Sequence, residues 1–192
     1  VNNEHFSTIK TCDGSQTEGQ KTLLNDLNLT RHSASPLPLH FSVSWNWDCC
    51  SCGLTGYTQR FLTWNQMNKS ALEHMIDITD SIDVQVAWNE NPELERRYSS
   101  AYEYWSANKY GTTNTTALYV LTYLNPNWDC RQSFAPHVKG ATTDSDACPT
   151  GQRTELGMYQ IFDEILINKP ESRGGLHFMA GVYSTGMPGW PL

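Results

Sequence analysis

The residues from Leu39 to Trp47 alternate strictly between apolar and polar side chains. This period of two is typical of a β-strand with one buried face and one wetter face. The run leads directly into three cysteines, and its last residues, Asn46–Cys49 (NWDC), recur as Asn127–Cys130 after another apolar run. We therefore expect a strand that carries aromatic side chains and is held by disulfide bonds.

Six cysteines and three N-glycosylation sequons predict a secreted glycoprotein. The cysteines are Cys12, Cys49, Cys50, Cys52, Cys130 and Cys148, and the sequon asparagines are Asn28, Asn68 and Asn114. An even number of cysteines favours three disulfide bonds formed in an oxidising compartment. All fifteen pairings stay open, with Cys130 and Cys148 favoured as a local pair because they enclose a polar loop. Zinc is the rival interpretation, but Cys49, Cys50 and Cys52 are too crowded for a zinc knuckle.

Length, charge and hydropathy narrow the class of protein further. The chain starts at Val1 without methionine or an apolar leader, which fits an extracellular protein whose signal peptide has been removed. Its formal net charge is −7 and no run of basic residues occurs, which argues against nucleic acid as a partner. No apolar run is long enough to span a membrane. We expect one secreted domain over residues 1–192, monomeric, with an extracellular polymer as its partner.

Apolar periodicity and capping residues predict the secondary structure. We expect helices over residues 17–29, 70–80, 92–109 and 155–167, and strands over residues 39–47, 57–64, 82–86, 117–124 and 176–183. The strand 57–64 follows the first strand after a turn containing glycine, so we predict that these two pair antiparallel. The helices and strands interleave without regular spacing. The sequence therefore predicts an α+β fold: one compact disulfide-stapled domain with a mainly antiparallel sheet and three to four helices.

The chain contains no motif with an established catalytic mechanism. The nucleophile-elbow, zinc-protease, phosphate-loop, dinucleotide and calcium-loop signatures do not occur. Asp144 and Asp146 form an Asp-Ser-Asp sequence, which is most often a solvated turn. We accordingly predict no cofactor and no metal site, and the candidate chemistry falls to carboxylates and histidines.

Three carboxylates are candidates for acid/base chemistry. Asp48 and Asp129 each follow a tryptophan and precede a cysteine at the end of a predicted strand. Glu155 begins the last helix, in line with apolar residues, where desolvation would favour a general acid. The candidate sugar-stacking residues are Trp45, Trp47 and Trp128. The structural alternatives are Asx turns for the two aspartates and a favourable helix-terminus charge for Glu155.

Two histidines lie on predicted strands. His40 belongs to the polar face of the first strand, and His177 lies between two apolar residues of the last. If these strands were neighbours, the two imidazoles and a carboxylate would form an acid/base site. The alternative is a hydrogen-bonded structural role for each histidine.

Two classes of function fit this sequence. The first is a small extracellular hydrolase acting on a polymer, with polysaccharide favoured because seven Trp and nine Tyr accompany an acidic charge balance. The second is a secreted binder without catalysis, such as a lectin-like module, an effector or a toxin. Facing carboxylates in a cleft favour the enzyme, and a flat aromatic patch favours the binder.

Overall fold

A computed structural model provides the structure of the chain. It describes residues 14–34, 36–44, 47, 49–53, 56–59, 61–86, 91–111, 113–124 and 155–178. Side chains are described for residues 18–34, 36–44, 47, 61–86, 96–111, 113–121 and 159–173.

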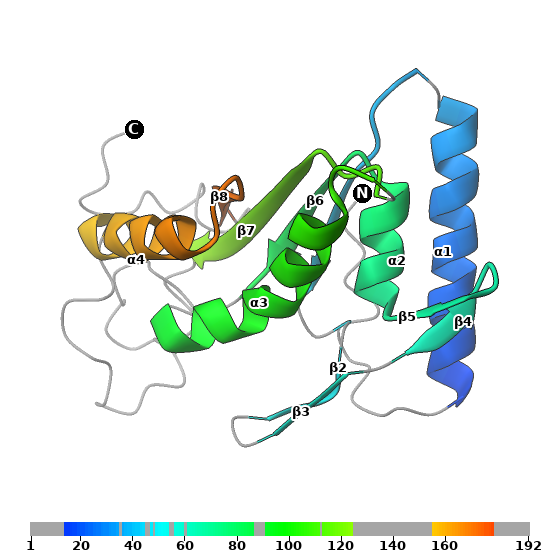
Figure 1. Cartoon of the computed structure of the whole chain (residues 1–192), viewed down its shortest axis with the longest axis horizontal. Coiled ribbons are helices and arrows are strands. Elements are labelled where there is room, and N and C mark those ends of the chain that lie inside the picture. Colours follow the sequence, from blue (N-terminus) through cyan, green and yellow to red (C-terminus); the bar gives the residue numbers. More distant parts are fainter. Residues whose placement is uncertain are drawn as a thin grey trace. The chain divides into compact units, whose positions relative to one another are not determined.

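The described residues form four helices and eight strands (Figure 1). In chain order the elements are α1 (Gly14–Ala34), β1 (His40–Ser44), β2 (Cys49–Gly53), β3 (Gly56–Gln59), β4 (Leu62–Trp64), β5 (Met67–Lys69), α2 (Ala71–Ile78), β6 (Ser81–Gln85), α3 (Asn91–Asn108), β7 (Ala117–Leu124), α4 (Glu155–Asn168) and β8 (Arg173–Phe178). The predicted combination of helices and sheets is therefore confirmed. Contacts divide the chain into two compact units, Val1–Gln85 with Arg97–Tyr119, and Val86–Arg96 with Val120–Leu192.

The largest sheet has the strand order β1-β6-β7-β8. Its first pair is parallel, with His40 opposite Ser81 and Ser44 opposite Gln85. The predicted antiparallel pairing is wrong for this sheet, because the partner of the first strand is β6 and not the residues that follow the turn. Residues 56–59 instead pair with β2, and β4 pairs with β5, in two small antiparallel hairpins.

Hydrogen bonds at both ends of β6 give the direction of β7. The Thr116 amide donates to the Asp80 carbonyl at 2.9 Å, and the Val86 amide donates to the Leu121 carbonyl at 2.7 Å. Strands β6 and β7 thus run in the same direction, as in a parallel pair. Parallel neighbours need long crossover connections, usually helical. Here α2 lies in the connection from β1 to β6, and α3 lies in the connection from β6 to β7.

One face of β1 and β6 is apolar and buried, and the other is polar. Phe41, Val43, Ile82 and Val84 are at most 2% exposed. Because side chains alternate along a strand, the residues between them occupy the opposite face. That second face carries His40, Ser42, Ser44, Ser81, Asp83 and Gln85. The side chains able to take part in chemistry therefore lie on the polar face of these two strands.

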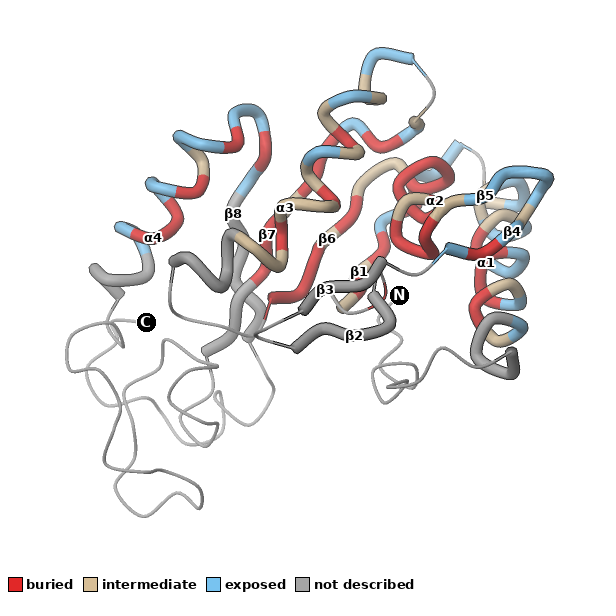
Figure 2. Tube along the Cα trace, turned by 60° about the horizontal axis from the view of Figure 1, so that its bottom comes forward, coloured by how far each residue is buried: buried red, intermediate tan, exposed pale blue. Residues whose placement is uncertain are grey.

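Helix α2 is buried along almost its whole length, whereas α1 alternates between buried and exposed residues (Figure 2). The α1 residues that face inward are Leu23, Leu24 and Leu27, as their spacing predicts. The first turn of α2 is closed by a capping box. Ser70 accepts a hydrogen bond from the Glu73 amide at 3.1 Å, and the Ser70 amide donates to the Glu73 carboxylate at 2.8 Å.

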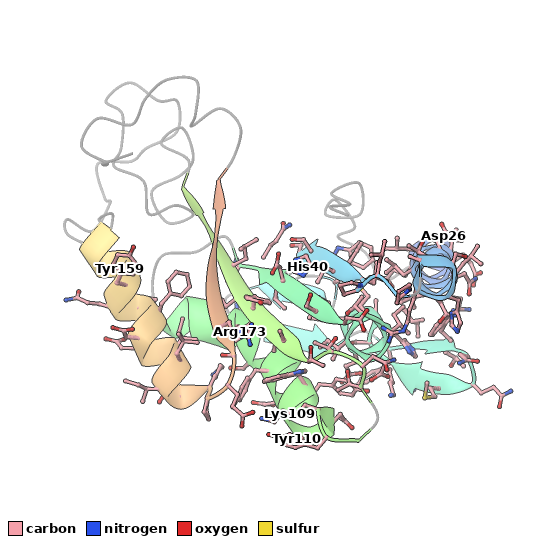
Figure 3. All side chains as sticks on the ribbon, turned by 90° about the horizontal axis from the view of Figure 1, so that it is seen from above. Asp26, His40, Lys109, Tyr110, Tyr159 and Arg173 are labelled. Atoms are coloured by element: carbon pink, nitrogen blue, oxygen red, sulfur yellow. The ribbon has the colours of Figure 1, made fainter. Side chains whose placement is uncertain are left out.

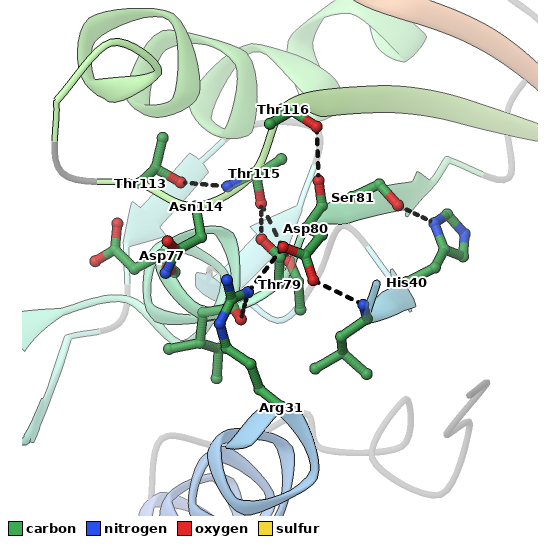
Figure 4. A network of polar contacts seen from close by, with 12 residues as sticks. Arg31, His40, Asp77, Thr79, Asp80, Ser81, Thr113, Asn114, Thr115 and Thr116 are labelled. Carbon is green, nitrogen blue, oxygen red and sulfur yellow. Dashed lines mark hydrogen bonds and ion pairs between the residues drawn. The ribbon is translucent and has the colours of Figure 1, made fainter. Parts of the chain in front are cut away.

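Residues 113–116 supply hydrogen bonds to the other end of α2 (Figure 4). The Thr115 hydroxyl lies 2.7 Å from the Ile76 carbonyl and 3.0 Å from the Thr79 carbonyl. The Asn114 side-chain amide donates to the Asp77 carbonyl at 2.7 Å. The last carbonyls of a helix lack partners within the helix. Here a segment more than 30 residues further along the chain provides them.

Arg31 and Asp80 connect α1, α2 and β1 at the same end of the sheet (Figure 4). The Arg31 guanidinium donates to the Ile78 carbonyl at 2.7 Å and lies 3.1 Å from the Asp80 carboxylate. That carboxylate also accepts from the Leu39 amide at 2.7 Å. The Asp80 carboxylate thereby holds the backbone of Leu39, the residue immediately before His40.

In the second unit, α4 begins at Glu155 and buries Ile161, Phe162 and Ile165. The apolar spacing of this helix predicts that Tyr159, Phe162 and Leu166 face inward; Phe162 is buried, but Tyr159 is 51% exposed. The helix ends one residue beyond its predicted end, and Glu171 adopts a positive φ of 69° in the turn before β8. Local periodicity therefore predicted the helix and the burial of Phe162, but not the burial of Ile161 and Ile165.

The turn between β4 and β5 leads to a first prediction. Asn65 and Gln66 have φ values of 48° and 65°. Two left-handed residues in a two-residue hairpin form a type I′ turn, which favours Asn-Gly. Gln66→Gly should raise the free energy of unfolding by about 0.5–1 kcal/mol, because glycine adopts this conformation without strain. Urea unfolding would measure it, with Gln66→Ala as the control that gains nothing. Equal midpoints for the glycine and alanine variants would contradict the prediction.

Candidate functional site

The imidazole of His40 lies between a hydroxyl and a carboxylate on the polar face of the sheet. Its Nδ1 is 2.6 Å from the Ser81 Oγ atom, and its Nε2 is 2.9 Å from the Asp83 Oδ2 atom. Ser81 and Asp83 are successive residues on one face of β6, and His40 is the register partner of Ser81. The His40 ring on β1 therefore contacts two side chains of the neighbouring strand, β6.

A second aromatic ring flanks this group. Tyr119 on β7 meets the His40 ring edge to face, with the ring centroids 6.2 Å apart and an interplanar angle of 78°. Further along the same face, the Gln85 amide donates to the Ser42 hydroxyl at 2.7 Å. Figure 3 shows His40 on the side of the strands away from the end of α3, where Lys109 and Tyr110 lie. We call His40, Ser81, Asp83 and Tyr119 the His40 cluster.

The contacts of His40 assign its tautomer. An ionised carboxylate can only accept hydrogen bonds, so Asp83 requires the proton to lie on Nε2. Nδ1 then carries the lone pair, and it accepts the Ser81 hydroxyl proton. The His40 side chain is 47% exposed and that of Asp83 is 18% exposed. The imidazole is therefore open to a reactant on one side while a largely covered carboxylate holds it on the other, which is an arrangement suited to general acid/base chemistry.

The strand carrying His177 is not adjacent to the strand carrying His40. His177 belongs to β8, and the order of the sheet puts β6 and β7 between β8 and β1. The condition for an acid/base site made by both histidines, that their strands be neighbours, is therefore not met. The side chain of His177 lies outside the part that the structure describes.

The three predicted carboxylates are placed only through the elements next to them. Asp48 and Asp129 lie outside the described residues, and Glu155 begins α4 without a described side chain. The strands that precede the two aspartates, β1 and β7, are the two neighbours of β6. His40 lies at the start of β1, four residues before its end, a separation of about 13 Å along a strand. His40 therefore lies at the first end of β1, and the chain continues toward Asp48 from the other end.

Of the three predicted stacking residues, the structure describes Trp47. Its side chain is 3% exposed, so it offers no ring face to a sugar and belongs to the core. Trp45 and Trp128 lie outside the described residues. Cys49, Cys50 and Cys52 form part of the β2 backbone. Their side chains, together with Cys12, Cys130 and Cys148, are outside the description, so the disulfide pairing stays a prediction.

The three sequon asparagines lie in three different settings. Asn68 is exposed on β5, Asn28 is partly exposed within α1, and Asn114 is exposed while its amide binds the Asp77 carbonyl. In the sequon of Asn68 the hydroxyl residue, Ser70, is fully buried as the cap of α2. A glycan at Asn68 would therefore have to be added before α2 folds.

Sequence reasoning identified His40 but missed Ser81, Asp83 and Tyr119. The alternation of Ile82 and Val84 was visible, and it implies a polar face formed by the residues between them. Which strand faces that polar row depends on the parallel pairing of β1 with β6. Because alternation carries no information on strand direction or partner, the cluster could not be assembled from sequence.

A partly buried ion pair lies elsewhere in the first unit, among β5, α2 and α3. The Lys69 ammonium is 2.6 Å from the Asp77 carboxylate and 2.6 Å from the Tyr104 hydroxyl, which itself donates to Asp77. Burial alone would lower the pKa of Lys69, but hydrogen bonds to Asp77 and Tyr104 outweigh it and the pKa is raised. Burial raises the pKa of Tyr104 to about 12. Lys69 thus stays charged and Tyr104 stays neutral at neutral pH, and we assign this group of contacts to stability.

His74 makes the stability of the fold depend on pH. Its ring is fully buried in α2 against Trp64, with centroids 5.3 Å apart, and Nε2 is 3.3 Å from the Leu62 carbonyl. Burial lowers the pKa of His74 below 6.5, although the Leu62 carbonyl and Asp77 oppose this. Below pH 6.5 the unfolded chain therefore binds a proton that the folded chain rejects, and stability falls as the pH falls toward the lowered pKa.

We expect the free energy of unfolding to decrease between pH 7.5 and pH 5, and His74→Gln should reduce this decrease. Urea unfolding at the two pH values measures both, with His32→Gln, an exposed histidine of α1, as the control. An equal decrease in wild type and His74→Gln would contradict the assignment.

Comparisons with known proteins add no relative. No protein-family model, no curated protein and no solved structure matches this chain. Among the residues that the structure describes, no group of three or more His, Cys, Asp or Glu side chains is arranged to hold a metal ion. The described helices also include none with the length and apolar character needed to cross a membrane.

Proposed function

We propose that the chain is a secreted hydrolase that acts on an extracellular polymer, with His40 as its general acid/base. The observation that carries this proposal is the half-exposed imidazole of His40, held at both nitrogens by Ser81 and Asp83. A positioned histidine of this kind contributes about 10²–10⁴-fold to proton-transfer steps.

The position of each partner supports the role of His40. The Leu39 amide is bound to Asp80, and five residues of β1 pair with β6, so the backbone that carries the imidazole is held on both sides. The Tyr119 ring lies nearly perpendicular to the imidazole and covers one side of it. Catalytic groups held by packing and hydrogen bonds require little reorganisation when the reaction occurs.

The choice of polysaccharide as the polymer comes from the composition and from residues that follow two strands in the sequence. The net charge of −7 makes an anionic polymer such as nucleic acid unsuitable. Of the two Trp-Asp pairs, the one that stays a candidate for sugar stacking is Trp128-Asp129, which follows β7 in the sequence, because Trp47 is buried. Tryptophan beside carboxylates is a frequent combination in sugar sites. Asp48, Asp129 and Glu155 accordingly stay candidates for a glycosidase reaction on the same polymer.

A product-release assay tests the proposal. The purified protein is incubated with plant, fungal and bacterial wall polymers, and soluble products are identified by mass spectrometry. We expect defined products from one polymer, with His40→Gln lowering the rate at least 100-fold and the control His32→Gln leaving it unchanged. Loss of products in Asp48→Asn or Asp129→Asn with full activity in His40→Gln would transfer the reaction to the carboxylates and contradict the role of His40.

The binder is the second candidate, and the same panel distinguishes it from the enzyme. Three large apolar side chains are exposed on the described surface. Leu37, before β1, is 71% exposed; Phe61, before β4, is 52% exposed; and Met67, on β5, is 38% exposed. Retention of the protein on one polymer without release of any product would favour this alternative and reject the hydrolase.

A further inference from the structure

We propose that Ser81 is the nucleophile of the His40 cluster and that the bond it breaks is a carboxylic ester, such as an acyl group carried on a polysaccharide. This inference rests on the proposed hydrolase function and names its substrate class. Ser81, His40 and Asp83 form a continuous chain of hydrogen bonds, 2.6 Å from hydroxyl to imidazole and 2.9 Å from imidazole to carboxylate. This is the connectivity of a nucleophile, its base and the group that orients the base.

The contacts of Ser81 differ from those of the neighbouring hydroxyls. The side chains of Thr113, Thr115 and Thr116 all donate to main-chain carbonyls between residues 76 and 80. Figure 4 shows the contacts of Thr115 with Thr79 and of Thr116 with Asp80. Such contacts are typical of structural threonines. The Ser81 hydroxyl points instead to an imidazole, and its side chain is partly exposed. Its backbone amide is bound to the Leu39 carbonyl at 3.3 Å, next to His40.

The tautomer of His40 gives the direction of proton transfer. With Nε2–H donated to Asp83, the lone pair of Nδ1 takes the proton from Ser81 as its oxygen attacks the ester carbonyl carbon. The alcohol part then leaves as the carbon–oxygen bond breaks, and it takes that proton from Nδ1. Water attacks the resulting acyl-serine, gives one proton to Nδ1, and the serine oxygen recovers it as the carboxylic acid departs. The atoms and protons balance with water as the only co-reactant.

The carboxylate of this cluster favours an ester over a glycosidic bond. Glycoside hydrolysis pairs two carboxyl groups across the sugar, about 5–10 Å apart. The His40 cluster contains one carboxylate, Asp83, and its Oδ2 atom is bound to the imidazole. A hydroxyl next to a histidine suits attack on an acyl carbon, which needs a nucleophile and one base.

Two probes test the inference on the full chain. The first is hydrolysis of p-nitrophenyl acetate, an activated ester. The second is covalent labelling by a fluorophosphonate, which phosphonylates an activated serine and releases fluoride. We expect turnover of the ester, with at least a 1000-fold loss in Ser81→Ala, and one label per chain that peptide mapping assigns to Ser81. The control is Ser106→Ala, because Ser106 lies on α3 and bonds to its own helix.

The outcomes separate this inference from the proposed function. Release of polymer products that depends on His40, without label on Ser81 and with full activity in Ser81→Ala, would overturn the nucleophile and keep the hydrolase. Absence of both polymer products and ester turnover would overturn both. Labelling is measured on the wild-type chain, so the test holds even if Ser81→Ala fails to fold.

Discussion

Asp83→Asn is expected to lower kcat for ester and polymer hydrolysis by about 10²–10⁴-fold. Asp83 accepts the Nε2–H of His40 at 2.9 Å, and this contact directs the lone pair of Nδ1 toward Ser81. An asparagine at this position has no negative charge to stabilise the imidazolium. Its amide group can also donate to Nε2, which moves the proton to Nδ1 and removes the base from the nucleophile.

The measurement must separate positioning of the base from loss of structure. We expect KM to change less than threefold and the urea midpoint to change little, while kcat falls. Asp83→Glu should recover part of the activity because it keeps the charge. The matched control is Asp26→Asn, an exposed aspartate of α1. A variant Asp83→Asn with normal kcat, or with a fall in kcat explained by unfolding, would refute the role of Asp83.

Trp105→Ala is expected to lower the free energy of unfolding by about 3–5 kcal/mol. The indole of Trp105 is 2% exposed in the core of the first unit. Its Nε1–H donates to the Thr115 carbonyl at 2.9 Å, and the Lys109 ammonium lies 4.9 Å from the centroid of the ring. An alanine leaves a cavity, leaves the Thr115 carbonyl without the indole donor, and removes the ring that the Lys109 ammonium contacts. Each of these losses lowers the free energy of unfolding.

Two further variants divide this loss into its parts. Trp105→Phe keeps most of the packing but loses the hydrogen bond, so it should cost about 1–2 kcal/mol. Tyr110→Ala removes a ring that is 86% exposed, and its effect should stay within about 0.5 kcal/mol. Urea unfolding of the four proteins gives the values. A cost below 1 kcal/mol for Trp105→Ala would contradict the packing described for this residue.

The helices and the most apolar strand were predictable because their signals are local. The strand 117–124 has the predicted bounds, α4 differs by one residue, and Ser70, the first residue of the predicted helix 70–80, is the N-cap of α2. Capping boxes, apolar periodicity and proline at a helix start depend on neighbours within a few positions. Each can be identified without knowing the rest of the fold.

The pairing of strands was not predictable from the same patterns. Leu39–Trp47 alternates equally well whether its partner runs parallel or antiparallel, and the nearest later strand suggested a hairpin. The partner of β1 is β6, which begins 41 residues after His40. The register of that parallel pair brings Ser81 and Asp83 to His40, so the site stayed hidden although one of its residues was identified.

Trp47 illustrates the limit of reading function from residue type. A tryptophan beside an aspartate suggested a sugar platform, yet its side chain is buried. The alternation that predicted the strand also places Trp47 on the same face as Phe41 and Val43, which are core residues. The alternation of apolar and polar residues therefore indicates that Trp47 is buried, and this was a better guide than its residue type.

The cap that residues 113–116 place on α2 has a consequence for the order of folding. The carbonyls of Ile76, Asp77 and Thr79 find their partners in residues 113–115, so a growing chain that has not reached this segment cannot complete the helix. The last turn of α2, the start of β6 and the start of β7 should consequently exchange their amide hydrogens as one cooperative unit. A fragment that stops at residue 111 should show a frayed α2, however well its capping box closes the other end.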